Sequence, residues 1–131
     1  MATIKDYLDS DICGTRLAGE DLTTSQYRFV ELNADSPSEW VLPSAGGVKA
    51  QGVLVSRPDT GEAAKVLTMQ GRIVPITCGE PISSGDKLQT DTNGRARVTG
   101  AYAGDHILGV ALEDGAGANS IIHMLFQYQG V

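Results

Sequence analysis

Residues 71–126 decide the fold, because in this stretch short apolar segments alternate with turn residues at nearly regular intervals. The segments and turns are, in order, Arg72-Ile73-Val74-Pro75-Ile76, Gly79-Glu80-Pro81, Ile82 through Gly85-Asp86-Lys87-Leu88, Asn93-Gly94, Ile107-Leu108-Gly109-Val110-Ala111-Leu112 and Ile121-Ile122-His123-Met124-Leu125-Phe126. Strands separated by turn signals at this spacing are typical of a small sandwich or barrel. The stretch contains no set of residues suited to run a reaction, so we expect it to form a rigid surface.

The residues before this stretch continue the β pattern. Four further strands are expected at 26–32, 39–42, 51–56 and 63–69, because each combines β-branched, aromatic or aliphatic residues and is bounded by turn residues. Asn93-Gly94 predicts a hairpin, since this dipeptide favours type I′ turn geometry. Capping residues are nowhere followed by a sustained helical period, so the predicted fold class is all-β, a small β-sandwich or barrel.

Composition excludes several classes of function. The chain has 131 residues, one domain's worth, and a formal net charge of −6. Binding of nucleic acid requires clustered Lys and Arg, whereas here the basic residues are scattered and none lies in 98–131. No apolar run approaches the roughly 18–20 residues of a membrane span, and no signal peptide is evident. We therefore expect a soluble protein made in the cytoplasm, with no nucleic-acid or membrane partner.

Residues 1–20 differ from the rest of the chain. Polar and acidic residues alternate there with four apolar ones, Ile4, Tyr7, Leu8 and Ile12. The spacing of Ile4, Leu8 and Ile12 would allow a short helix, but one too short to be stable alone. A frayed terminus is one alternative, and an extended arm that orders against a partner is preferred. The expected organisation is an arm at 1–20 and a single β domain at 21–131.

Candidates for catalysis are few. His106 and His123 are the only histidines, and Asp105 could orient His106, so a small hydrolase is one alternative. No Ser or Cys stands in a nucleophile-elbow context near either histidine, and a structural role is expected for His123. The carboxylate pairs Glu20-Asp21 and Glu113-Asp114 would point to opposite faces of a strand, so both fit solvated loops. We expect no enzyme activity and no cofactor.

Four other residues each have two interpretations. Cys13 and Cys78 are either free thiols in a reducing compartment or a disulfide, and neither has metal-ligand spacing to another Cys or His. Lys87 follows Asp86, as the modified lysine does in some lipoyl or biotinyl carrier domains, but its position at a strand start favours a solvated lysine. Trp40 is either a core residue or part of an oligomer interface, where Trp is enriched.

The order of motifs resembles that of capsid decoration proteins, also called cement proteins, of tailed bacteriophages. The resemblance covers roughly residues 20–127. It rests on an acidic start, a strand near Tyr27–Leu32 and four phrases, namely Gly71 to Ile76, Ile82 to Leu88, Gly94-Arg95-Ala96 and Ile107 to Glu113, followed by the closing apolar strand. Cys13, Cys78 and Trp40 have no counterpart in that pattern.

The resemblance implies a β-tulip-like protomer, often a homotrimer, on the outside of the expanded phage head. Such proteins bind across junctions between major capsid proteins and stabilise the shell against the pressure of packaged DNA. The N-terminal arm would contact the capsid through Ile4, Tyr7, Leu8 and Ile12, and the protein would reside in the virion. The alternatives are a phage tail or baseplate module, or a receptor-binding tip, and a carrier domain presenting Lys87.

Overall fold

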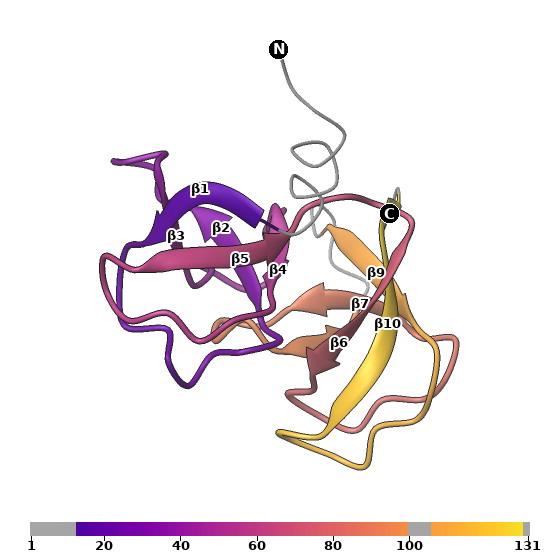
Figure 1. Cartoon of the computed structure of the whole chain (residues 1–131). Helices are drawn as coiled ribbons and strands as arrows, with labels where there is room; N and C mark the ends of the chain where they lie inside the picture. Colours follow the sequence, from indigo (N-terminus) through magenta and orange to yellow (C-terminus); the bar gives the residue numbers. More distant parts are fainter. Residues whose placement is uncertain (1–12, 100–105, 130–131) are drawn as a thin grey trace.

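The computed structural model describes residues 13–99 and 106–129, and ten strands are found there (Figure 1). Their bounds are β1 Cys13–Ala18, β2 Phe29–Leu32, β3 Glu39–Val41, β4 Gly52–Leu54, β5 Ala63–Leu67, β6 Arg72–Thr77, β7 Lys87–Thr90, β8 Ala96–Val98, β9 Ile107–Ala111 and β10 Ile121–Gln129. No helix occurs among these residues, and therefore none long and apolar enough to cross a membrane. The predicted all-β fold is confirmed.

The first five strands close into a barrel in the order β1-β3-β2-β4-β5. The barrel closes because β1 pairs with β3 in parallel and with β5 antiparallel. Residues 13–18 of the expected arm thus form a barrel strand, while residues 1–12 lie outside the described part. The sequence did not indicate this strand because residues 16–18 supply no large buried side chain: Ala18 is small, and Leu17 is 41% exposed.

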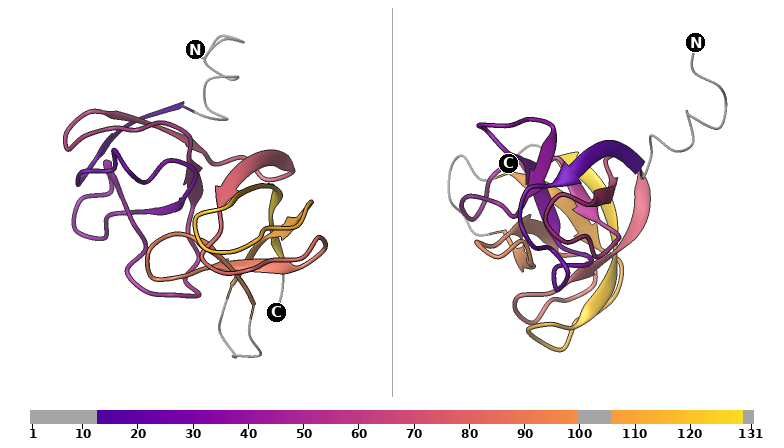
Figure 2. Two further views of the ribbon diagram at one scale, coloured as in Figure 1. Left: turned by 90° about the horizontal axis from the view of Figure 1, so that it is seen from below. Right: turned by 60° about the vertical axis from the view of Figure 1, so that its left-hand side comes forward.

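The last five strands form a second sheet in the order β6-β10-β9-β7-β8, with antiparallel neighbours throughout. The sheet curls until its two edges meet, since Cys78, directly after β6, forms a single parallel bridge with Ala96 of β8. Pro75 lies on the edge strand β6, the place in a sheet where a missing backbone N–H costs least. This sheet lies beside the barrel (Figure 2).

The barrel and the second sheet are joined through three strands, β2, β4 and β5, which we call the shared wall. Each contributes one side chain to the barrel core and the adjacent one to the core beneath the second sheet. The pairs, barrel core first, are Val30 and Phe29, Leu54 and Val53, and Val66 and Leu67. Because neighbouring residues on a strand point to opposite faces, both faces of this wall are buried inside one chain.

Two local details differ from the sequence-based expectations. The strand expected at 26–32 begins only at Phe29, because Tyr27 has a left-handed backbone with φ of 62°. The turn after β7 is not type I′, since that geometry needs positive φ at both central residues and only Gly94, at 79°, has it. The Asp91 carboxylate organises this turn instead, accepting the backbone N–H groups of Asn93 at 2.8 Å and Arg95 at 2.9 Å.

Candidate interaction surface

The four residues predicted to contact the capsid, Ile4, Tyr7, Leu8 and Ile12, lie outside the described residues, and their role stays a prediction. Trp40 lies in β3 and is only 3% exposed, packed in the barrel core with Val30 and Leu54. Its side chain thus occupies the core position that the sequence left as one alternative. Its role at an oligomer interface stays a prediction.

The histidines stand apart from one another. His106 is exposed, and its backbone N–H donates to the carbonyl of Gly47 at 3.0 Å, while Asp105 lies outside the described residues. His123 is exposed on β10, where the Oε1 atom of Glu113 lies 2.7 Å from its backbone nitrogen and 3.1 Å from Nδ1. These bonds, the backbone one first, lower the pKa of Glu113. His123 and Glu113 thus connect the start of β10 to the loop after β9.

The other polar candidates have structural partners. Glu20 accepts the backbone N–H of Leu42 at 3.1 Å, and Asp114 accepts that of Ser84 at 2.8 Å. Lys87 is exposed as the first residue of β7, and not at a hairpin tip. Cys78 is a buried free thiol, and burial, followed by the charge of Glu113, raises its pKa. Within the described part of the chain, no three His, Cys, Asp or Glu side chains are grouped to hold a metal ion.

The side of the second sheet that faces away from the core carries exposed apolar residues, and we call it the outer face. Ile73 of β6, Leu125 of β10 and Val110 of β9 lie side by side in one cross-strand row. The exposed fractions are 64% for Ile73 and 44% for Leu112, which follows β9. Ile121, at the start of β10, is 56% exposed. Exposed apolar side chains on one face of a sheet make that face a candidate surface for a partner.

Sequence reasoning missed this outer face, although a signal was present. Along β10 the residues Ile122, Met124 and Phe126 are buried, which accounts for one parity of the strand. The opposite parity contains Ile121 and Leu125 together with the polar His123 and Gln127, so the strand carries apolar side chains on both sides. Among the described residues only the face with Ile122, Met124 and Phe126 is covered by the core, and the apolar side chains on the other face are left accessible to a partner.

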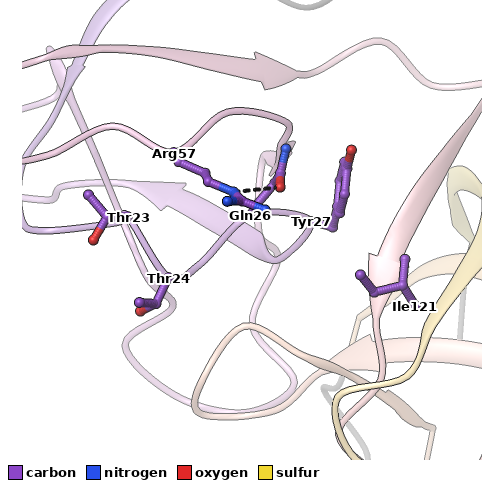
Figure 3. Close-up of a pocket in the computed structure, with 6 residues that line it drawn as sticks. All are labelled: Thr23, Thr24, Gln26, Tyr27, Arg57 and Ile121. Carbon is purple, nitrogen blue, oxygen red and sulfur yellow. Dashed lines mark hydrogen bonds between the residues drawn. The ribbon is translucent and has the colours of Figure 1, made fainter.

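A shallow pocket lies at the seam between the barrel and the second sheet (Figure 3). Its volume is about 290 Å³, and six residues line it: Thr23, Thr24, Gln26, Tyr27, Arg57 and Ile121. Arg57 Nε donates to Gln26 Oε1 at 2.9 Å, and Gln26 Nε2 in turn donates to the carbonyl of Val55 at 3.2 Å. Arg57 also borders an adjoining hollow that contains Glu62. The pocket thus combines an oriented cation with an aromatic and an aliphatic side chain.

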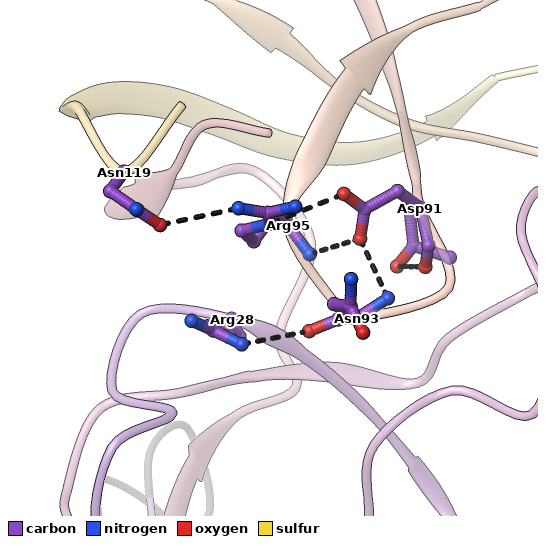
Figure 4. Close-up of polar contacts among 6 residues, drawn as sticks. Arg28, Asp91, Asn93, Arg95 and Asn119 are labelled. Carbon is purple, nitrogen blue, oxygen red and sulfur yellow. Dashed lines mark hydrogen bonds and ion pairs between the residues drawn. The ribbon is translucent and has the colours of Figure 1, made fainter. Parts of the chain in front are cut away.

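Another polar cluster, at the seam near the β7–β8 turn, is structural (Figure 4). Arg28 Nη1 donates to the carbonyl of Asn93 at 3.3 Å, which connects the segment before β2 to the turn between β7 and β8. Arg95 lies 3.3 Å from the Asp91 carboxylate and also donates to Asn119 at 3.3 Å. Burial and then the charge of Arg95 lower the pKa of Arg28. The Arg28–Asn93 bond thus links the barrel to the second sheet, and the bonds of Arg95 link the β7–β8 turn to the loop before β10.

Comparison with known proteins gives one informative result. No protein-family model matches the sequence, and no curated protein matches it either. Among solved structures, the chain is similar to the N base of the head fiber protein gp8.5 of bacteriophage phi29, with a TM-score of 0.67 and 18% identity. The match covers 88% of this chain and 95% of that one. At this level of identity the likeness establishes a shared fold.

Proposed function

We propose that this protein is a structural component of a phage head that decorates the outer surface of the capsid. One observation carries the proposal: the fold is that of the base of a phage head fiber, matched over nearly the full length of both chains. The motif order that resembles capsid decoration proteins supports the same assignment independently of the fold. The protein acts by binding, without catalysis and without a cofactor.

In the proposed mechanism the protein binds across junctions between major capsid proteins on the expanded head and stabilises the shell against internal DNA pressure. A homotrimer presents several arms at once, and closed symmetry of this kind is common among oligomers. Each arm contacts the capsid through Ile4, Tyr7, Leu8 and Ile12. Ordering an arm costs conformational entropy, but repeated contacts on a symmetric shell add through multivalency. The protein is made in the host cytoplasm and ends in the virion.

We assign the outer face to the capsid contact as well. The face carries the strongly exposed aliphatic side chains of Ile73, Leu112 and Ile121 beside the exposed His123, and burying such apolar groups against a partner is favourable. The Arg28–Asn93 and Asp91–Arg95 contacts and the shared wall support this face, so little conformational entropy is lost when it docks.

The test is co-sedimentation of the purified protein with empty expanded heads, together with the count of copies per head. Saturable binding of hundreds of copies is expected, whereas a handful per particle would point to the tail or baseplate alternative. The variant Leu112→Ser should reduce occupancy. Leu17→Ser is the matched control, because Leu17 on the barrel is 41% exposed and Leu112 is 44% exposed. Equal losses in the two variants, or no binding by the native chain, would contradict the proposal.

Native mass spectrometry beside the denatured intact mass tests the remaining points. A trimer at the bare chain mass is expected. A covalent mass addition that disappears in Lys87→Arg would instead establish a carrier domain.

A further inference from the structure

The seam pocket of Figure 3 has a cation that the described residues do not neutralise. Arg57 uses Nε on Gln26, and neither of its Nη nitrogens has a hydrogen-bond or ion-pair partner in the described part of the chain. Glu62, in the adjoining hollow, is occupied with the backbone N–H of Asp59 at 2.6 Å. A guanidinium held along one edge leaves its two Nη groups as a preoriented fork, the geometry that a carboxylate accepts in a bidentate manner.

The backbone of the pocket is strained at the aromatic residue that lines it. Tyr27 adopts φ of 62°, a left-handed conformation that is unfavourable for a residue with a bulky side chain. Two short hydrogen bonds hold it there: its N–H donates to Leu54 O at 2.7 Å, and its carbonyl accepts the N–H of Thr77 at 2.7 Å. Strain of this kind at a bulky residue is found where a binding site requires it.

The remaining walls select the character of the ligand. Ile121 is 56% exposed and faces the pocket opposite Arg57, so an apolar group can be covered there. Thr23 donates its hydroxyl to Asp21 at 2.7 Å, which places a negative charge beside the pocket. That charge, together with the net charge of −6, disfavours a polyanion such as nucleic acid. A ligand with a single carboxylate next to an apolar side chain can pair with Arg57 and pack against Ile121 at the same time.

We infer that the seam pocket binds an acidic residue with an apolar neighbour, presented by a peptide segment of a partner protein. Arg57 binds the carboxylate, and Tyr27 and Ile121 cover the apolar neighbour. Ile121 also belongs to the outer face, so the pocket borders one end of that face. The inference rests on the proposed function only where it identifies the partner as the capsid.

The first experiment titrates the ¹⁵N-labelled full chain with the peptide N-acetyl-Leu-Asp-Leu amide and follows the Arg57 Nε–H, the Gln26 side-chain amide and the Ile121 backbone amide. Saturable shifts with a dissociation constant in about the millimolar range are expected, as for a few contacts made by a small ligand. The Leu-Asn-Leu peptide should bind at least about tenfold more weakly, because it lacks the charge that Arg57 pairs with. Equal binding of the two peptides, or no saturable shift, would overturn the inference.

Variants locate the site. Arg57→Gln should abolish the preference for the acidic peptide. Arg16→Gln is the matched control, because Arg16 is also exposed and donates Nε to a protein oxygen, that of Pro37 at 3.0 Å, but does not line the pocket. Tyr27→Asn should fold, since Asn tolerates positive φ, and should weaken binding. Retained preference in Arg57→Gln, or equal loss in Arg16→Gln, would refute the site.

Binding of the native chain and of Arg57→Gln to empty expanded heads tests this inference separately from the proposed function. If native chain binds heads and Arg57→Gln binds equally well, the pocket has no role in docking and the decoration proposal stands. If the pocket binds the acidic peptide but the native chain does not bind heads, the decoration proposal fails and the pocket remains a peptide site.

Discussion

The shared wall and the outer face are built from the same kinds of residue but have opposite surroundings. Phe29 and Val30 are adjacent on β2, and both are fully buried because one chain supplies a core on each side. Ile121 and Ile122 are adjacent on β10, yet Ile122 is 2% exposed and Ile121 is 56% exposed. Adjacent apolar residues therefore contribute to two internal cores in β2, whereas in β10 one of the two residues lies on an open surface.

Removing a side chain from the shared wall should have the largest effect on the free energy of unfolding. Phe29→Ala should lower the free energy of unfolding by about 3–5 kcal/mol, because it opens a cavity where the barrel meets the second core. Urea unfolding, monitored by Trp40 fluorescence, measures the loss. A loss below about 1 kcal/mol, the range of a surface change, would contradict a two-faced wall.

A change in the β7–β8 turn, which contacts β2, should have the second-largest effect on stability. Gly94→Ala should cost about 1–3 kcal/mol, because Gly94 has φ of 79° and an added Cβ would lie 2.6 Å from the carbonyl oxygen of Phe29. Thermal unfolding measures the effect. Gly61→Ala is the control for φ alone, since Gly61 has φ of 81° with no atom near its Cβ position. Equal losses of stability in the two variants would show that the close approach of Gly94 to the Phe29 carbonyl does not contribute to stability.

A smaller loss is expected from the turn that Asp91 organises. Asp91→Ala should cost about 1–2 kcal/mol, because two backbone N–H groups and Arg95 lose their acceptor. Denaturant unfolding measures it. Asp59→Ala, in an exposed turn where the carboxylate accepts the N–H of Thr60, is the comparison, and a larger effect there would be inconsistent with the seam role of Asp91.

A substitution on the outer face should weaken binding to heads without lowering the stability of the fold. Ile73→Thr should change the free energy of unfolding by less than about 0.5 kcal/mol, because Ile73 is 64% exposed and Thr keeps the β-branched shape. Occupancy on heads should nevertheless fall. Denaturation and co-sedimentation on the same preparation test both halves. A large loss of stability would mean that Ile73 belongs to the core.

The weakest effect concerns pH at the edge of the outer face. The pKa of Glu113 is lowered in the folded chain, so its stabilising contribution is present above the unfolded value and is lost as pH falls through the folded one. Glu113→Gln should therefore differ from the native chain near about pH 6 and converge with it near about pH 3. Unfolding curves at the two pH values test this, and a difference that grows on acidification would refute it.

Sequence patterns predicted the strands of the second sheet closely, because their apolar segments are long and separated by strong turn residues. For example, the segment from Ile107 to Leu112 matches β9, Ile107–Ala111. They failed at β1, where the buried Ala18 is small and Leu17 is exposed, and at Tyr27, whose left-handed backbone is held by hydrogen bonds to Leu54 and Thr77. Such partners are distant in the sequence, so no local pattern reports them.

The seam pocket was equally absent from the sequence analysis. Gln26 and Arg57 lie 31 residues apart, and Ile121 is more distant still. Nothing in the local sequence of any of the three indicates a shared site.

The sequence by itself determined the all-β class, the positions of most strands and the scarcity of reactive groups, since these depend on local propensity and alternation. Only the tertiary structure decided which apolar residues are covered. Burial is a property of what packs on a strand: the barrel core covers one face of β2 and the core beneath the second sheet covers the other, while one face of β10 stays open. The core and the candidate docking surface are therefore distinguished by packing, and not by residue type.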